Sequence, residues 1–264
     1  MNTAKNKILS TENLSIGYQQ KSHQKVIAKG MNLTIQGGSF TAVIGQNGIG
    51  KSTLLRTLSS VQPPLEGSVL INQKNSTSYT HQELAKTISL VLTERIPESQ
   101  LTVFELVALG RQPYTNWMDR LTKEDLEKIQ WAMKETHIEE FQDHLFHELS
   151  DGQLQRVLIA RALAQDTQII ILDEPTAHLD MHQTIIIFEL LHQLTISTKK
   201  TIIISTHEIN FATKMCDELI LLSKNKIYAG TTAALIAQDA FETVFSSEIV
   251  KFDKTLEQFV INNN

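Results

Sequence analysis

The first residues whose types and spacing could carry out chemistry form a glycine-rich stretch near the start of the chain. It fits the pattern G-x-x-x-x-G-K-[ST] in full. Its members, here called the phosphate loop, are Gly45, Gln46, Asn47, Gly48, Ile49, Gly50, Lys51, Ser52 and Thr53. Glycines let consecutive backbone N–H groups turn inward around an anion, and the positive end of a helix dipole adds to the attraction. The Lys51 ammonium would reach the terminal phosphates of a nucleotide, and the Ser52 hydroxyl would bind Mg²⁺.

The residues on either side of the phosphate loop have the character that the motif requires. Residues 40–44 are mostly apolar and partly β-branched, which favours a buried strand. Leu54, Leu55 and Leu58 recur at helical spacing. The alternative is a glycine-rich turn with a chance Lys-Ser pair, which does not require a strand before it and a helix after it. The sequence therefore predicts a site for a nucleotide phosphate with Mg²⁺.

Two adjacent carboxylates follow a second apolar run. Residues 169–172 are Ile-Ile-Ile-Leu, and Asp173 and Glu174 come directly after them. At the carboxyl edge of a parallel sheet, this pair would point into the ligand crevice. Asp173 could hold Mg²⁺, and Glu174 could polarise the water that attacks a γ-phosphate. Many strands end in acidic turns, so the pair becomes informative only together with the phosphate loop upstream.

The composition is that of an ordinary globular protein. The chain has 264 residues, of which 41% are hydrophobic and 20% charged, and its net charge is -5 with a pI near 6.0. The acidic balance gives no indication of a nucleic-acid partner. One cysteine excludes an internal disulfide framework. Because the apolar runs are of strand length and residues 1–7 contain no apolar signal region, we expect a cytoplasmic chain.

The first third of the chain predicts antiparallel strands around the phosphate loop. Alternating patterns indicate strands at residues 8–18 and 26–35, with a polar turn between them, and another short strand at residues 67–71. Capping-box patterns open helices after Thr80, Thr102 and Thr122. A strand is expected at residues 87–92. From about residue 93 to 164 we expect helices and loops with no strand.

Strands and helices alternate in the second half. Strands are expected at residues 168–172, 201–205 and 218–222, and helices at 182–194 and 208–215. This alternation implies right-handed crossovers and a mostly parallel sheet, hence an α/β fold. Residues 225–230 suggest a hairpin that closes the sheet, with small helices after it.

One further segment identifies a family. Its residues, Leu149, Ser150, Asp151, Gly152 and Gln153, precede the acidic strand end. Ser150 and Gln153 form a capping box, so the segment can be read simply as a helix start. It also closely resembles the signature of ABC-type ATPases, and the motifs between Gly45 and His207 match that family in order and spacing.

The resemblance implies a fold and a domain arrangement. The fold is that of a P-loop NTPase (RecA-like), with a mostly parallel sheet core, an N-terminal antiparallel β subdomain and an inserted α-helical subdomain. Residues 1–264 would form a single ABC-type ATPase domain. The helical subdomain would span about residues 93–165, and a C-terminal extension would span about residues 231–264.

The resemblance also implies an ATP site shared between two copies of the chain. Ser150 and Gly152 would donate to ATP bound by the phosphate loop of the opposite subunit in a homodimer. Tyr18 resembles the aromatic residue that stacks on adenine, although it can also be an ordinary strand tyrosine. Leu179 and Asp180 resemble the D-loop at the dimer interface. His207 resembles the switch histidine that contacts the γ-phosphate and would act in catalysis with Glu174.

The chain departs from the family pattern at three places. The family usually has a glutamine after the strand at residues 88–92, where this chain has Thr93 and then Glu94. That glutamine bridges Mg²⁺ and the membrane partner, and either residue could substitute for it. Asp151 replaces the usual glycine of the signature, and we expect its carboxylate to point away from phosphate. Ile49 is bulkier than the usual residue but keeps its backbone N–H.

Two segments resemble the branch that serves importers of ferric siderophores, haem and cobalamin. They are residues 105–114 (ELVALGRQPY) and 175–180 (PTAHLD). The first lies where that branch meets a membrane permease, although helix packing alone could also explain it. The resemblance implies a peripheral ATPase on the inner face of the membrane. It would be docked on a permease that a substrate-binding protein feeds.

Other functions remain as alternatives. A soluble ABC-type ATPase could act on DNA or ribosomes, but this chain has neither long coiled-coil insertions nor a second ATPase domain. A nucleotide-binding regulator without hydrolysis is suggested by Thr93 and opposed by Glu174 and His207. A GTPase is disfavoured because residues 225–228 (NKIY) lack the aspartate of a guanine-reading Asn-Lys-x-Asp motif.

Overall fold

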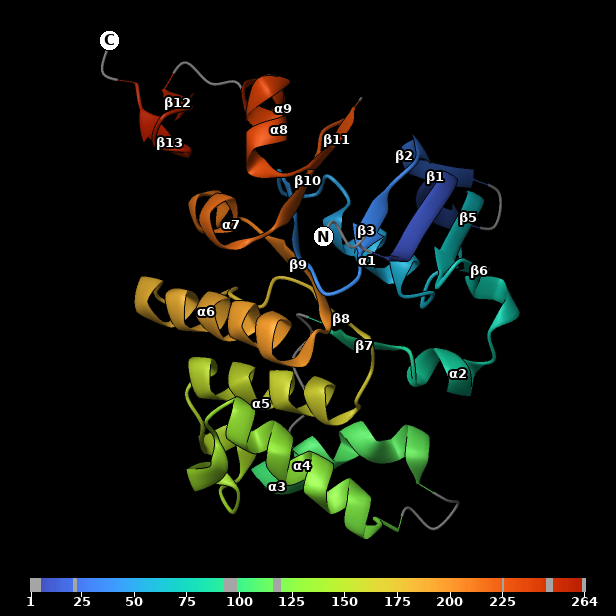
Figure 1. Ribbon diagram of the computed structural model, residues 1–264, viewed down its shortest axis with the longest axis vertical. Coiled ribbons are helices and arrows are strands. Elements are labelled where there is room, and N and C mark those ends of the chain that lie inside the picture. Colours follow the sequence, from blue (N-terminus) through green and yellow to red (C-terminus); the bar gives the residue numbers. More distant parts are fainter. Residues whose placement is uncertain are drawn as a thin grey trace, which may run out of the picture.

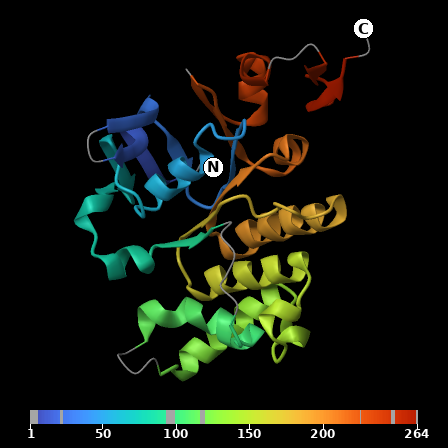
Figure 2. The same cartoon turned by 180° about the vertical axis from the view of Figure 1, so that it is seen from behind.

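The computed structural model describes residues 6–20, 23–92, 99–115, 120–224, 226–245 and 249–262. The described residues form three sheets with helices around them (Figure 1). The helices α3, α4 and α5 lie at one end. The central sheet lies in the middle, and an antiparallel sheet and the C-terminal elements lie toward the other end, as the view from behind also shows (Figure 2).

The central sheet has six strands in the order β11-β10-β4-β9-β8-β7. They are β4 (Phe40–Gly45), β7 (Ile88–Val91), β8 (Ile169–Leu172), β9 (Thr201–Thr206), β10 (Glu218–Leu222) and β11 (Ile227–Gly230). β11 is antiparallel to β10, and the other neighbours are parallel. The predicted α/β fold with a mostly parallel sheet and a closing hairpin is therefore confirmed.

Side chains that alternate along each central strand enter two different cores. In β8, Ile170 and Leu172 join a core shared with α6 (Met181–Thr198), whereas Ile169 and Ile171 join a core shared with α1 (Lys51–Leu58). Burial on both faces explains why the strand is an unbroken apolar run rather than an alternating one. Because both faces of these strands are packed in a core, the positions of the strand ends are fixed.

The antiparallel sheet has the order β2-β1-β5-β6, with β3 also paired to β1. Its strands are β1 (Lys7–Gln20), β2 (His23–Met31), β3 (Thr34–Gln36), β5 (Glu66–Ile71) and β6 (Lys74–Asn75). The single strand expected at residues 26–35 is in fact two, which pair with different ends of β1. Gly30 has φ +62°, and the pairing of β1 with β2 is irregular between Leu14 and Gly17, so one straight strand cannot follow β1.

Between β7 and β8 the described residues form helices and loops, as expected. The helices are α3 (Val103–Ala108), the 3₁₀ helix η2 (Leu109–Tyr114), α4 (Lys123–Glu135) and α5 (Asp151–Ala164). All four predicted capping boxes form, at Thr102, at Thr122, at Ser150 and, before the helix α2 (His81–Ala85), at Thr80. Each box satisfies otherwise unpaired N–H groups in the first turn, so it fixes where the helix begins.

A buried ion pair fastens η2 to its neighbours. The Arg111 side chain is 4% exposed; its Nε donates to Asp125 Oδ1 at 2.8 Å and its Nη1 to Ala164 O at 2.8 Å. Burial alone would raise the pKa of Asp125, but hydrogen bonds from Thr122 and Arg111 hold it below its usual value. The two hydrogen bonds of Arg111 tie η2 to both α4 and α5. The guanidinium also lies 3.9 Å over the ring of Tyr114, which belongs to η2 itself.

The C-terminal segment contains more than the small helices that we expected. After α7 (Ile209–Met215) and β10–β11 come α8 (Thr232–Ala237) and α9 (Ala240–Phe245), followed by the C-terminal hairpin of β12 (Val250–Asp253) and β13 (Gln258–Ile261). Within this hairpin, Phe252 and Phe259 pack against Phe241 of α9. A two-stranded ribbon is marginal alone, so this aromatic cluster supplies its stability.

Among the residues that the structure describes, each helix is too short or too polar to cross a bilayer.

Replacing Phe188 of α6 by alanine tests the larger core. The ring is fully buried and lies against Phe40 and Phe211, with centroids 6.2 and 5.9 Å away. We expect Phe188→Ala to lower the free energy of unfolding by about 3–5 kcal/mol in urea titrations, because it leaves a cavity between the sheet and α6. Ile196→Ala, on the same helix but 49% exposed, is the control and should change that free energy by less than about 0.5 kcal/mol. Equal effects of the two substitutions would contradict this view of the core.

Candidate functional site

The phosphate loop joins the end of β4 to the start of α1, as the sequence predicted. Gly48 and Gly50 have φ values of +72° and +111°, which L side chains rarely adopt. A Cβ on Gly50 would also lie 2.3 Å from Ile27 Cγ2. Since Gly50 is the N-cap of α1 and makes no side-chain cap, the first N–H groups of the helix are left for an anion.

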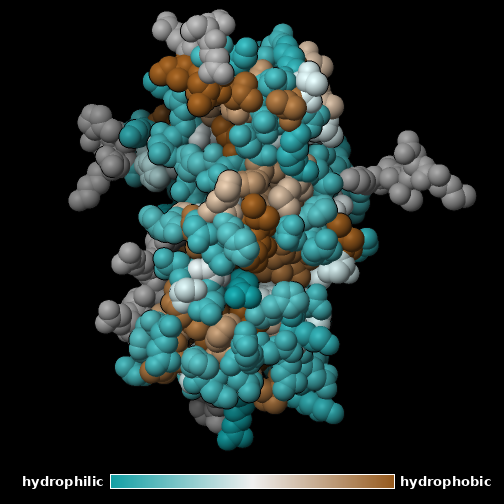
Figure 3. Space-filling model, turned by 90° about the vertical axis from the view of Figure 1, so that its left-hand side faces the viewer, coloured by the Kyte–Doolittle hydropathy of each residue, from teal (hydrophilic) through white to brown (hydrophobic). Residues whose placement is uncertain are grey.

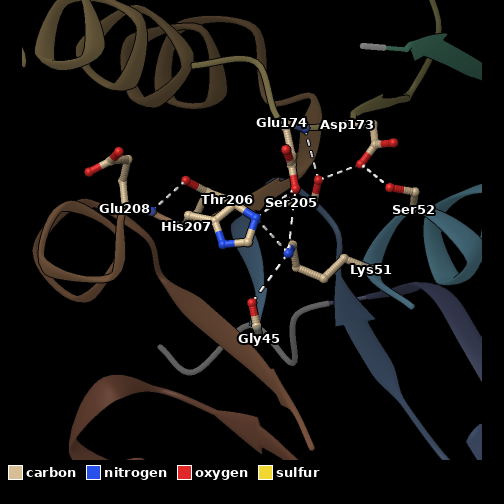
Figure 4. A network of polar contacts seen from close by, with 9 residues as sticks. All are labelled: Gly45, Lys51, Ser52, Asp173, Glu174, Ser205, Thr206, His207 and Glu208. Atoms are coloured by element: carbon tan, nitrogen blue, oxygen red, sulfur yellow. Dashed lines mark hydrogen bonds and ion pairs between the residues drawn. The ribbon is translucent and has the colours of Figure 1, made fainter. Parts of the chain in front are cut away.

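Two serines hold the acidic end of β8. Asp173 Oδ1 accepts hydrogen bonds from Ser52 Oγ at 3.0 Å and from Ser205 Oγ at 2.6 Å. Ser205 Oγ in turn accepts from the backbone N–H of Glu174 at 2.8 Å. Glu174 has φ +46°, a strained backbone conformation for this residue type. The hydroxyl of Ser205 therefore orients both acidic residues, as Figure 4 shows.

Ser205 was missed by the sequence reasoning. It is fully buried on β9, two residues before His207, in a strand that otherwise contains isoleucines and threonines. A buried hydroxyl needs a hydrogen-bond partner, and residues two apart in a strand face the same side. This spacing from His207 is the signal that could have identified it.

Lys51, Glu174 and His207 form a compact charged group. Lys51 Nζ lies 3.2 Å from Gly45 O, to which it donates, 3.4 Å from Glu174 Oε1 and 2.8 Å from His207 Nε2. His207 Nε2 also lies 2.8 Å from Glu174 Oε1. One ring nitrogen cannot accept from Lys51 and donate to Glu174 at the same time, so the tautomer decides which contact is a hydrogen bond.

Burial opposes the charge on Lys51. The side chain is 4% exposed, and desolvation lowers the pKa of Lys51 from its ordinary value, although Glu174 and Asp173 partly offset that effect. Because little water surrounds this ammonium, it interacts strongly with any anion placed beside it. Glu174 and His207 are more exposed, with 28% and 39% of their side chains accessible.

Tyr18 lies at the same edge, near the end of β1. Its hydroxyl and Thr53 Oγ1 are 2.8 Å apart, and the residue is 41% exposed. The ring therefore lies beside the start of α1 and has a free face. The structure brings together Tyr18, the phosphate loop, the acidic pair and His207, although they are far apart in the sequence.

The signature residues 149–153 lie elsewhere in the same chain. Ser150 is the N-cap of α5, and its backbone N–H donates to Gln153 Oε1 at 2.9 Å. Asp151 is exposed, and Gly152 is buried against Gln183 of α6, where a Cβ would lie 2.4 Å from Gln183 Oε1. Within the described part of the chain, no hydrogen bond or ion pair joins this segment to the phosphate loop.

The other predicted positions have separate outcomes. Asp180 caps α6 by accepting from the Gln183 N–H at 2.8 Å, and Leu179 is half-buried beside it. Thr93 and Glu94 lie outside the described residues. Histidines 137, 144 and 147 are exposed. The described residues contain no cluster of three or more histidine, cysteine or acidic side chains fit for a metal.

Comparisons with known sequences match most of the chain. The sequence model of the family described as ABC transporter matches residues 28–177. The chain is 41% identical over 239 residues to YusV of Bacillus subtilis, named as a probable siderophore transport system ATP-binding protein, covering 90% of this chain and 86% of that protein. It is 37% identical over 250 residues to the iron(3+)-hydroxamate import ATP-binding protein FhuC of the same organism, with 94% and 91% covered.

Comparisons with solved structures confirm the predicted P-loop NTPase fold. A metal-chelate type ABC transporter in an inward-facing conformation matches with a TM-score of 0.79 and 29% identity, covering 97% of this chain and 96% of that chain. The cassette MJ0796, solved as a dimer in a post-hydrolysis state with ADP and Pi, matches with a TM-score of 0.72 and 31% identity, covering 85% and 98%.

Two glycine substitutions separate backbone strain from crowding in the phosphate loop. A Cβ added at Gly48 would have no atom within 4 Å. Gly48→Ala should therefore cost only the conformational energy of an alanine in the left-handed region, about 1–2 kcal/mol. An alanine at Gly50, where φ is +111°, lies farther from the left-handed region and must also displace Ile27, so we expect Gly50→Ala to weaken nucleotide binding much more strongly. Calorimetric titration of each variant with ATP measures the difference. Equal affinities would show that the contact with Ile27 is unimportant.

Proposed function

We propose that this chain, which belongs to the ABC transporter family of ATP-binding proteins, powers the import of an iron complex or of cobalamin. It is an ATPase of this family. The observation that carries the proposal is the meeting of the phosphate loop with Asp173, Glu174 and His207 at one sheet edge. The relatives YusV and FhuC are named for siderophore and iron(3+)-hydroxamate transport, and they support the choice of cargo.

The phosphate loop binds ATP through its backbone N–H groups and Lys51. Lys51 neutralises the β- and γ-phosphates, and the scarcity of water around its ammonium strengthens that attraction. Glu174 polarises the attacking water as general base, and His207 contacts the γ-phosphate. The 2.8 Å contact between the His207 and Glu174 side chains supports the proposal that both act on the same γ-phosphate. Tyr18 stacks on adenine with its exposed face.

Ser52 and Asp173 fit a Mg²⁺ site. Their oxygens lie 3.0 Å apart, and hydroxyl and carboxylate oxygens are the hard ligands that Mg²⁺ prefers together with phosphates and waters. When bound, the ion supplies charge neutralisation at the phosphates. Ser205 keeps the Asp173 carboxylate aimed at Ser52, so the donor pair is preorganised.

A second copy of the chain completes the site. Ser150 and Gly152 at the start of α5 present a helix N-terminus that suits the γ-phosphate of ATP held by the partner. Leu179 and Asp180 lie at the interface of this head-to-tail homodimer. The exposed Asp151 carboxylate points away from phosphate. The dimeric MJ0796 cassette supports this arrangement.

Coupling to transport requires a membrane permease. The η2 segment, held rigid by Arg111, contacts that permease, and a substrate-binding protein delivers the cargo to it. Either Thr93 or Glu94 takes the place of the usual glutamine between Mg²⁺ and the permease. The chain works as a peripheral subunit on the inner face of the membrane. The metal-chelate type transporter, whose cassette shares this fold, supports the assignment.

Glu174→Gln tests the hydrolytic mechanism. We expect ATP turnover to fall by about a hundredfold or more, because the amide cannot act as a general base. ATP binding should persist, so an ATP-bound dimer should accumulate in size-exclusion chromatography. Glu139→Gln, an exposed carboxylate in the helical segment, is the control and should leave turnover unchanged. A monomeric Glu174→Gln variant with normal turnover contradicts the mechanism.

Co-purification tests the proposed partner. The tagged chain, extracted from its native host in mild detergent, should retain a polytopic permease, and cells without the chain should lose uptake of ⁵⁵Fe-siderophore or labelled cobalamin. Purification with ribosomes or DNA instead, with uptake unchanged, favours the alternative of a soluble ATPase. Retention of the permease with loss of a different cargo would refute the iron or cobalamin assignment alone.

A further inference from the structure

The C-terminal hairpin is fastened to the helix that follows His207. Three side chains of α7 reach its backbone, and they are Asn210, Thr213 and Lys214. Residues three and four apart lie on one face of a helix, so a single face of α7 carries all of these contacts. The hairpin is therefore bonded to a helix that begins two residues after His207.

Asn210 makes the most specific of these contacts. Its Oδ1 accepts from the Phe259 N–H at 2.8 Å, and its Nδ2 donates to Phe259 O at 3.4 Å. The side-chain amide thus pairs with one residue of β13 as a neighbouring strand would. Thr213, which is 5% exposed, donates from Oγ1 to Glu257 O at 2.9 Å, and Lys214 donates to Leu256 O at 2.6 Å.

A very short turn connects α7 to His207. The Ile209 N–H donates to His207 O at 2.9 Å, and Glu208 between them has φ -82° and ψ 67°. These angles are those of an inverse γ-turn, which leaves little slack between the histidine and the helix. The Glu208 N–H donates to Thr206 Oγ1 at 3.0 Å, so the turn is also fixed to β9 (Figure 4). A shift of α7 must therefore move the His207 ring.

Packing alone leaves α7 room to shift on the hairpin side. A pocket of about 370 Å³ lies between the turn and the hairpin, lined in part by His207, Asn210, Phe245 and Phe259. On the other side, Phe211 packs against Phe188 of α6. Since α7 has only seven residues, it depends on such neighbours for its position. On the hairpin side, the polar contacts of Asn210, Thr213 and Lys214 limit its movement.

The hairpin is itself well anchored. The Phe252 ring stacks on Phe241 of α9 at 4.0 Å, and Phe259 meets Phe245 edge to face at 5.6 Å. Its apolar residues Ile249, Leu256 and Ile261 face solvent instead. Figure 3 shows apolar side chains gathered at the height of α9 and the hairpin, and a second apolar area at mid-height on the same face. The hairpin can therefore act as a fixed support for α7.

We propose that residues 250–261 position His207 for ATP hydrolysis through α7, with Asn210 and Thr213 as the positioning residues. This inference rests on the proposed function of His207 at the γ-phosphate. Neither positioning residue touches the phosphate loop in the described structure. Their effect reaches the site through the turn at Glu208.

The test replaces both positioning side chains by apolar groups of similar shape. The double variant Asn210→Leu/Thr213→Val should lower kcat for ATP by roughly tenfold, within the loss that a displacement of about 1 Å can cause. KM for ATP should stay within about twofold, because the phosphate loop is unchanged. The single variant Asn210→Asp keeps the acceptor for the Phe259 N–H, so its kcat should lie much closer to the wild-type value than that of the double variant. Phe259→Ala, which loosens the hairpin from its other side, should reproduce the loss.

A His207→Ala background shows whether the effect passes through the histidine. Single-turnover assays with the full-length chain in excess keep slow hydrolysis measurable. If the inference is right, the double substitution causes no further loss in that background. The same fractional loss with and without His207 would overturn it, as would a lowered melting temperature with unchanged kcat.

The control is Asn32→Leu. This asparagine also bonds a distant backbone group, accepting from the Asn13 N–H at 2.9 Å, but it lies between β2 and β3, away from α7 and the C-terminal hairpin. It should leave kcat unchanged, and a tenfold loss there would overturn the inference by showing that any such contact has the same effect. If the wild-type chain hydrolyses ATP and the double substitution leaves kcat unchanged, only this inference is refuted. If no permease co-purifies and cells without the chain keep their uptake, only the transport proposal is refuted.

Discussion

The parallel alignment of β4, β9 and β8 is the constraint on which the site depends. These neighbouring strands end at one edge of the sheet, so the phosphate loop, His207 and the acidic pair emerge side by side. Ser205, on the middle strand, bonds Asp173 and the Glu174 backbone on its neighbour. The backbone ladder of three fully buried strands thus sets distances that the polar side chains could not maintain alone.

Features encoded within a few consecutive residues could be predicted from the sequence. The capping boxes at Thr102 and Thr122 are each complete in four residues, and both form. The phosphate loop requires only a strand, a glycine-rich turn and a helix start in that order. The isoleucine run of β8 identifies a strand buried on both faces, because a half-exposed strand would alternate.

Features that depend on contacts between distant residues could not be predicted in this way. Ser205 bonds a carboxylate 32 positions away, and the Asn210 side chain pairs with a strand 49 positions away. The hairpin at residues 250–261 has little strand signal of its own and is stabilised by Phe241. The two strands in place of one at residues 23–36 follow the irregular shape of β1, which no local pattern reveals.

The order of the central sheet has a consequence for how the protein is made. β4, which ends at Gly45, lies between β9 and β10, and both of these strands belong to the last third of the chain. At translation rates of about 5–20 residues per second, β4 waits roughly 10–30 s for its first neighbour in the sheet. During synthesis this apolar strand has only early segments such as β1 and α1 to cover it. The strand that bears the phosphate loop is thus the first central strand to be made, yet it gains both of its neighbours only after residue 200, so it is the central strand that waits longest for its partners during synthesis.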